Sequence, residues 1–180
     1  MPGLADAGAR VVLTADHGMN AKSLPDGQPN VTYLQDYLDR FAPGALVILP
    51  ITDPYVVHHG ALGSFATVYI APGDDAEAIA VMLRDLPAVE LVITAEEAQD
   101  VLELPRDRIG DLCVMARRDA VLGTREDEHD LSALTRPLRS HGGLHEQPVP
   151  MACSHAPAQW PDKLRNFDAF DVALNRMGSA

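Results

Sequence analysis

The strongest structural signal lies near the start of the chain, in the apolar run Val11-Val12-Leu13-Thr14-Ala15, which is followed directly by Asp16-His17-Gly18. The run is continuously apolar and contains β-branched residues, a pattern typical of a strand that is buried on both faces. Such strands occur in parallel sheets that lie beneath helices. The run therefore predicts a buried strand over residues 11–15.

Further along the chain, short apolar runs alternate with stretches of helical spacing. The apolar runs predict strands over 45–51, 65–71, 89–94 and 112–116, with a further short stretch at 149–153. Apolar residues at helical spacing predict helices after Asn30, after Asp74, over 95–102 and over 166–177. Because strands and helices alternate, the sequence predicts an α/β fold built in layers.

The composition is that of an acidic globular protein. The 180 residues carry 14 Lys and Arg against 26 Asp and Glu, which gives a formal net charge of −12, and 47% of them are hydrophobic. A chain of this length can bury a sizeable core, so we expect a single domain over residues 1–180. The negative charge disfavours nucleic acids and acidic membranes as partners, since like charges repel. An anionic substrate would need local positive charge, either clustered Arg and Lys or a bound metal.

The sequence indicates a cytoplasmic protein. Its first ten residues lack a basic segment followed by an apolar stretch, and no apolar run approaches the roughly 18 residues that a membrane span requires. The two cysteines, Cys113 and Cys153, do not form the pattern of a disulfide framework. Cys113 lies within an apolar run and is interpreted as a small core residue.

Asp16 and His17 lie just past the carboxyl end of the first predicted strand, where ligands bind in open α/β sheets. The backbone can turn beyond a strand end, so the carboxylate and the imidazole could converge on one cation. Both groups are good ligands for Zn²⁺, and Gly18 gives the loop room to bend. The alternative is that Asp16 caps the next segment and His17 is a polar loop residue.

His141, which is followed by Gly142-Gly143, is the second candidate ligand. Two glycines after a histidine allow the backbone to approach a ligand closely, but they also form ordinary turns. His145 and Glu146 lie nearby and could take the same role. The pair His58-His59 fits either a turn or a metal site. The residues alone leave these alternatives open.

Taken together, two motifs resemble the alkaline phosphatase superfamily and its phosphodiesterase-like branch. They are Thr14-Ala15-Asp16-His17-Gly18-Met19 and, far downstream, Ser140-His141-Gly142-Gly143 with Val149-Pro150. Within this branch the chain most resembles the phosphonoacetate hydrolases. The closer resemblance is carried by the segments 16–22, 51–60, 108–112 and 139–150.

The resemblance implies an alkaline-phosphatase-like fold, a three-layer αβα sandwich with a mostly parallel sheet. It also implies a reaction of phosphonate catabolism, in which a hydrolase with two zinc ions cleaves the C–P bond of phosphonoacetate to acetate and phosphate. By position, Asp16 and His17 match ligands of one metal ion, and His141 matches a ligand of the other. The implied partner is a small anionic phosphonate, which two cations would attract despite the net negative charge.

The chain departs from the family pattern at its N-terminal side. Family members carry a first Asp ligand, the threonine nucleophile and a second Asp and His ligand pair upstream of the motif that begins with Asp16. Only fifteen residues precede Asp16. We therefore expect a C-terminal fragment of such an enzyme, through truncation or a misplaced start. Its sheet would be incomplete at the N-terminal side, and the chain would hold no catalytic residue and show little activity alone.

This departure leaves two alternatives open. One is another superfamily phosphodiesterase or nucleotide pyrophosphatase, and the other is a non-catalytic degenerate domain. An incomplete sheet also exposes apolar surface and unpaired strand edges, so we expect association into a homo-oligomer.

Overall fold

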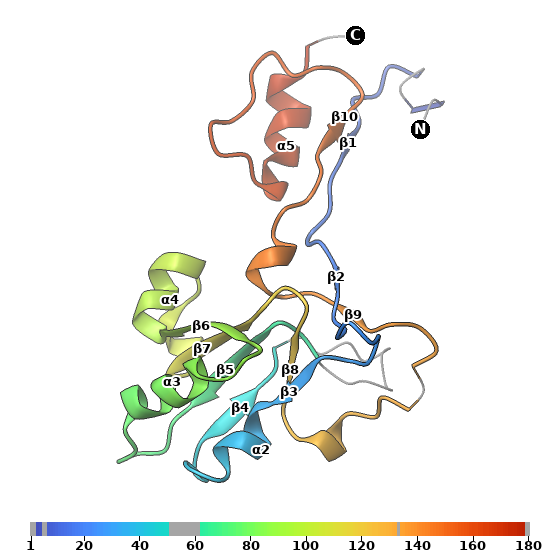
Figure 1. Ribbon diagram of the computed structural model, residues 1–180. Coiled ribbons are helices and arrows are strands. Elements are labelled where there is room, and N and C mark those ends of the chain that lie inside the picture. The colour runs from blue at the N-terminus through green and yellow to red at the C-terminus, as the bar shows by residue number, and fades with distance from the viewer. Residues whose placement is uncertain (1–2, 5–6, 51–61, 133, 179–180) are drawn as a thin grey trace. The chain divides into compact units, whose positions relative to one another are not determined.

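The computed structural model describes residues 3–4, 7–50, 62–132 and 134–178. The chain divides into two compact units, Met1–Gly18 with Gln147–Ala180 and Met19–Glu146. Figure 1 labels the helices and strands of both units. A single domain over residues 1–180 stays a prediction.

The larger unit contains a four-stranded sheet in the order β4-β5-β7-β6, in which every neighbouring pair is antiparallel. Its strands are β4 (Leu46–Ile48), β5 (Phe65–Tyr69), β6 (Val89–Thr94) and β7 (Leu112–Ala116). The same unit holds the helices α2 (Leu34–Leu38), α3 (Ala76–Arg84) and α4 (Ala95–Leu102). Strand β6, helix α4 and strand β7 have the bounds that the sequence predicts.

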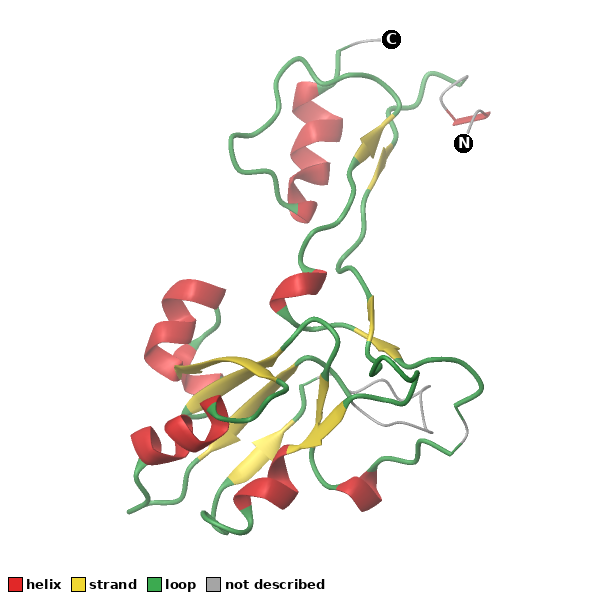
Figure 2. Cartoon of the chain, viewed as in Figure 1, coloured by secondary structure: helices red, strands yellow, loops and turns green. Residues whose placement is uncertain are grey.

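Apolar side chains cover both faces of this sheet, because successive residues of a strand point to opposite faces. In β7, Leu112 and Val114 join the cluster that contains Ile79 and Leu83 of α3. The alternate residues of the same strand, Cys113 and Met115, join a second cluster that contains Ala95 and Ala98 of α4. Helices therefore lie against both faces, and Figure 2 shows them in red beside the yellow strands. This agrees with the layered α/β arrangement that the sequence predicts.

The antiparallel strand directions correct the expectation of a mostly parallel sheet. The segment β5-α3-β6 does connect two parallel strands, but β7 lies between them and is antiparallel to both. All three strands are apolar because both faces are covered. A strand that is buried on both faces has an apolar sequence whether its neighbours are parallel or antiparallel to it. The apolar runs therefore predict the strands correctly and leave their pairing undetermined.

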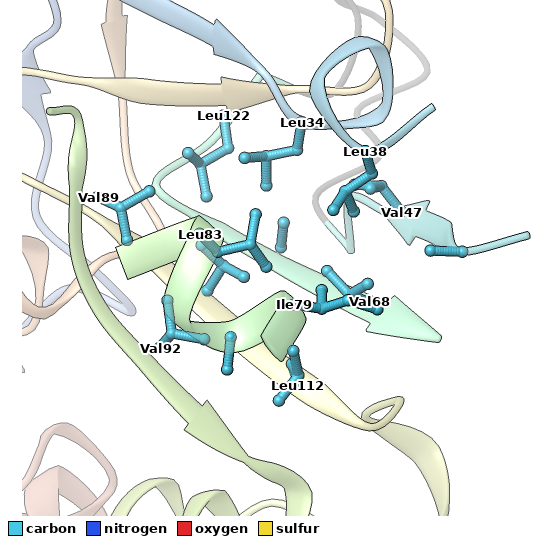
Figure 3. Packing of buried hydrophobic residues seen from close by; sticks show 14 of the residues in the cluster. Leu34, Leu38, Val47, Val68, Ile79, Leu83, Val89, Val92, Leu112 and Leu122 are labelled. Carbon is cyan, nitrogen blue, oxygen red and sulfur yellow. The ribbon is translucent and has the colours of Figure 1, made fainter. Parts of the chain in front are cut away.

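The main core lies between α2, α3 and the sheet. Leu34, Leu38 and Leu83 are fully buried there. In Figure 3 the side chains of Ile79 and Leu83 point from α3 toward the strands. Helix α3 begins at an Asp75 cap, whose carboxylate accepts from the backbone of Glu77 and Ala78, rather than at the predicted Asp74. No helix in the described ranges is both long enough and apolar enough to cross a membrane.

The other strands of the larger unit form two small ladders. A parallel pair joins β3 (Val31–Tyr33) to β8 (Val121–Gly123), and an antiparallel pair joins β2 (Asn20–Ala21) to β9 (Arg139–Ser140). The helix expected after Asn30 thus begins only at Leu34, because the three residues before it pair with β8. The described residues of this unit also form the 3₁₀ turns η1 (Arg106–Arg108), η2 (Glu126–Glu128) and η3 (Leu144–Glu146).

The smaller unit pairs β1 (Val12–Leu13) with β10 (Ala152–Cys153) in an antiparallel ladder. The sequence predicts a strand here that is buried on both faces, but Leu13 is 52% exposed, so that expectation is wrong for the described residues. A helical segment follows, formed by η4 (Asn166–Asp168), α5 (Ala169–Asp171) and η5 (Val172–Arg176). Phe170 is 75% exposed on it, while Val172 and Met177 are buried.

Gly110, at the turn that leads into β7, holds a left-handed backbone with φ +70°. A Cβ at this position would lie 2.7 Å from the Val68 carbonyl oxygen of β5, whereas Gly73, with φ +102°, has nothing within 4 Å. Replacement by alanine adds left-handed strain of about 1–2 kcal/mol at either position. At Gly110 it also forces backbone apart, so Gly110→Ala should cost about 2 kcal/mol more than Gly73→Ala. Urea unfolding followed by circular dichroism measures both, and equal losses would contradict the expectation.

Candidate functional site

The Asp16–His17 pair lies on the loop that follows β1 in the smaller unit. The Asp16 Oδ2 and His17 Nε2 atoms are 3.7 Å apart, and the Asp16 side chain is 87% exposed. The Asp16 Oδ1 atom accepts a hydrogen bond from the His17 backbone N–H at 3.0 Å. The carboxylate and the imidazole of these adjacent residues therefore face each other just past the end of the strand.

The tautomer of His17 follows from its neighbour. The Nδ1 atom lies 2.8 Å from the Gly18 carbonyl oxygen, which can only accept, so Nδ1 carries the proton of the neutral ring. The Nε2 atom then carries the lone pair. Metal-binding histidines commonly donate their second ring N–H to a backbone carbonyl in this way, which fixes the ring orientation.

The donor set of Asp16 and His17 fits a zinc ion. Two ligands at about 2.0 Å on one tetrahedral zinc are separated by about 3.3 Å, close to the 3.7 Å between the Asp16 and His17 ligand atoms. The Asn166 side chain supports the loop by donating to the carbonyl oxygens of Ala15 at 3.3 Å and Asp16 at 3.1 Å. No spacing in the sequence pointed to Asn166, because it lies 150 residues away from Asp16.

His141 follows strand β9 in the larger unit. Its carbonyl oxygen accepts from the Ser64 backbone N–H at 2.8 Å. The preceding Ser140 hydroxyl donates to the Leu62 carbonyl at 2.6 Å, and Gly142 takes a left-handed backbone with φ +102°. The backbone around His141 is thus fixed on both sides. Asp16 and His17 belong to one unit and His141 to the other, so a two-metal site in which Asp16 and His17 bind one ion and His141 binds the second stays a proposal.

The other histidines that the sequence offered as candidate ligands differ in what the structure says of them. His145 places Nε2 2.6 Å from Glu90 Oε2 of β6, so it is committed to a carboxylate. His58 and His59 lie outside the described residues. Within the described ranges, no group of three or more His, Cys, Asp or Glu side chains gathers in a way that could hold a metal ion.

A buried ion pair that sequence analysis missed lies beneath the His141 turn. Lys22 Nζ is 2.9 Å from Glu146 Oε1, and the two side chains are 0% and 1% exposed. The same carboxylate oxygen accepts from the Asn20 side chain at 2.6 Å, and Oε2 accepts from the Gly143 backbone N–H at 3.0 Å. Lys22 also donates to the Arg118 carbonyl at 2.8 Å. Each charged group therefore has several partners.

Because of this network, we expect the larger unit to lose stability as the pH falls into the acid range. Burial by itself raises the pKa of Glu146, but hydrogen bonds from Lys22 and Asn20, the Lys22 charge and the Gly143 amide outweigh it and hold the pKa below 4.5. A carboxyl with a lowered folded pKa stabilises the folded state above its unfolded pKa, and that contribution is lost as pH falls through the folded value.

We expect the acid dependence to disappear with the pair. The difference in unfolding free energy between the unaltered chain and Lys22→Met/Glu146→Leu should stay constant from pH 7 to about pH 5. Below that, the unaltered chain should lose stability relative to the double variant. Urea midpoints at stepped pH values measure this difference. A difference that stays flat down to pH 3 would contradict the assignment.

Cys113 is a core residue, as the sequence predicts. It is fully buried in β7, and burial raises the pKa of its thiol to about 11. A thiol with such a pKa is protonated at neutral pH, so Cys113 is unsuited to act as a nucleophile.

Two known proteins with similar sequences carry the same name. No protein family model matches the chain. Phosphonoacetate hydrolase from Sinorhizobium meliloti 1021, solved in complexes with phosphonoformate and with phosphonoacetate, is 51% identical with a TM-score of 0.89. The match covers 96% of this chain and 43% of that one. A phosphonoacetate hydrolase of Penicillium oxalicum is 56% identical over 41 residues, which are 21% of this chain and 57% of that protein.

A more distant structure has the same fold. Murine ectonucleotide pyrophosphatase/phosphodiesterase 5 has a TM-score of 0.52 at 16% identity over 87% of this chain and 37% of its own. Together these structures indicate an alkaline-phosphatase-like α/β fold. The chain spans less than half the length of the solved relatives. The similarity to the phosphonoacetate hydrolases, which the segments 16–22, 51–60, 108–112 and 139–150 predicted, is therefore confirmed over 96% of the chain.

Proposed function

We propose that this chain supplies the metal-binding residues Asp16, His17 and His141 to a zinc-dependent hydrolase that cleaves phosphonoacetate to acetate and phosphate. The observation that carries the proposal is the Asp16–His17 pair, whose ligand atoms lie 3.7 Å apart with the ring tautomer set by Gly18. The similarity to enzymes of this name supports the substrate, a small anionic phosphonate.

The chain's own residues prepare a site for cations. Asp16 supplies a carboxylate that is almost fully exposed, and His17 supplies Nε2 while its Nδ1 proton is held by the Gly18 carbonyl. His141 would supply a ligand to the second metal. When bound, two zinc ions neutralise phosphonate oxygens and stabilise the charge that develops during C–P cleavage. A chain with net charge −12 needs local positive charge to attract an anion, and bound cations would supply it.

We also propose that the 180-residue chain alone has little or no activity. The resemblance assigns the nucleophile to a threonine upstream of the Asp16 motif, and the described residues place Cys113 in the core rather than in a site. Turnover would require the nucleophile and the further ligands that the resemblance places upstream of the Asp16 motif.

The first test is zinc binding by the purified chain, measured by competition with a chromophoric chelator. We expect Asp16→Asn to weaken zinc binding about 10-fold or more, since it removes a charged ligand. Asp162→Asn is the matched control, because it removes an exposed carboxylate of the same unit that lies outside the pair. Equal zinc affinity in the two variants would overturn the assignment of Asp16.

Phosphate release from phosphonoacetate is the second test. Release by the isolated chain that is abolished by a chelator would overturn the proposal that it is inactive. The absence of zinc binding in the unaltered chain would instead favour the non-catalytic alternative. The likeness to the nucleotide pyrophosphatase is one of fold, at 16% identity, so no nucleotide substrate is proposed from it.

A further inference from the structure

The turn that follows His141 is held by three successive residues of η3, each through a different kind of contact. Leu144 packs against the apolar cluster on the α4 face of the sheet. His145 pairs with Glu90 of β6 at 2.6 Å, and Glu146 turns inward to Lys22 at 2.9 Å. The segment is therefore anchored to the sheet and to the chain near β2.

Glu146 connects this anchor directly to the glycines beside His141. Its Oε2 atom accepts from the Gly143 N–H at 3.0 Å, and its Oε1 atom accepts from Lys22 and Asn20. On the opposite side of the turn, the Ser64 N–H donates to the His141 carbonyl at 2.8 Å. The turn is thus tied from two sides, and a single carboxylate provides one of the two ties.

Space around Gly143 is closed by the same residues. A Cβ at position 143 would lie 2.8 Å from the Ser64 Cβ and 3.1 Å from Glu146 Oε2. Ser64 is itself fixed, because its buried hydroxyl donates to the Ala120 carbonyl at 3.0 Å. Any side chain at position 143 would therefore press against both Ser64 and Glu146.

Stability alone does not account for a charged pair at this place. Burying a carboxylate and an ammonium group removes both from water, and apolar residues of similar volume often give equal or greater stability. What the charged pair adds is direction, because the carboxylate accepts from Gly143, Asn20 and Lys22 together and so joins the turn to the chain near β2.

We propose that Glu146, held by Lys22, is a positioning residue for His141 and fixes the turn so that the imidazole meets its metal ion in one orientation. The inference rests on the proposed function, which assigns His141 as a metal ligand. Partners that orient a metal ligand change metal affinity about 10–100-fold when they are removed. Glu146 acts here through the backbone of Gly143, to which it is hydrogen bonded.

A zinc titration of the whole 180-residue chain, followed by the imidazole ¹⁵N resonances, tests the inference. Each histidine then reports its own apparent Kd. In Lys22→Met/Glu146→Leu, which leaves no buried charge unpaired, we expect the apparent Kd at His141 to rise about 10–100-fold. Amide hydrogen exchange at Gly143 should accelerate in the same variant, because its acceptor is lost.

Leu83→Ala is the control for lost stability, since it weakens the core of the same unit without touching the turn. It should leave the apparent Kd at His141 within about twofold, and His17 serves as the reference in the other unit. An unchanged Kd at His141 in the double variant overturns the inference alone. No response of His141 to zinc in the unaltered chain overturns its assignment as a ligand, and the inference with it.

Discussion

Glu146→Leu is expected to lower the free energy of unfolding by about 3–5 kcal/mol, because it leaves the Lys22 ammonium buried with the Arg118 carbonyl as its one remaining hydrogen-bond partner among the described residues. Lys22→Met should cost less, since the carboxylate keeps the N–H donors of Asn20 and Gly143. The double variant Lys22→Met/Glu146→Leu should be more stable than Glu146→Leu alone. Removing the second charge relieves the penalty that the first removal creates.

Urea unfolding of the four chains completes a double-mutant cycle, which isolates the coupling between the two residues. Far-UV circular dichroism must follow the transition, because the single tryptophan, Trp160, belongs to the other unit. Glu77→Ala is the control, since its pair with Arg84 is exposed and should contribute less than about 1 kcal/mol. Additive losses in the cycle would show that the two charges are not coupled.

Leu83→Ala should produce the second large effect, a loss of about 2–5 kcal/mol, because it removes a fully buried side chain from the centre of the main core. Figure 3 shows Leu83 among the side chains that α3 directs toward the strands. Since the surrounding strands are hydrogen bonded to one another, they cannot close fully around the space that is left.

Val81→Ala, on the same helix, provides the matched control. Val81 is 48% exposed, and its replacement should change stability by no more than about 0.5 kcal/mol. The same urea and circular dichroism measurement applies to both variants. Similar losses for the two would contradict the assignment of the core to the Leu83 side of α3.

Local signals predicted several elements correctly. Helix α4 begins after Thr94, whose hydroxyl accepts from the Glu97 N–H while the Glu97 carboxylate accepts from the Thr94 N–H. These interactions join residues three positions apart, so they are encoded in the sequence of one segment. The predicted start of α2 after Asn30 was wrong, because Val31–Tyr33 pair with β8 as a strand in place of the first helical turn.

The candidate site divides in a similar way. Asp16 and His17 are adjacent, so their motif could be identified from sequence, and the structure adds the distance and the tautomer. Asn166 and the pairing of Lys22 with Glu146 were not predicted, and the sequence named Glu146 only as an alternative ligand. A lysine and a glutamate are ordinarily exposed, and nothing in their local surroundings marks these two as buried.

The sequence alone identified a family resemblance and the candidate ligands Asp16, His17 and His141. It also predicted most of the strands of the four-stranded sheet and the helices that cover it. All of these are encoded by neighbouring residues or by short motifs. Strand order and direction, and the burial of Lys22 against Glu146, were decided only when the chain folded. Those features join groups far apart in the chain, 124 residues for the ion pair, and their energy depends on which surfaces exclude water together.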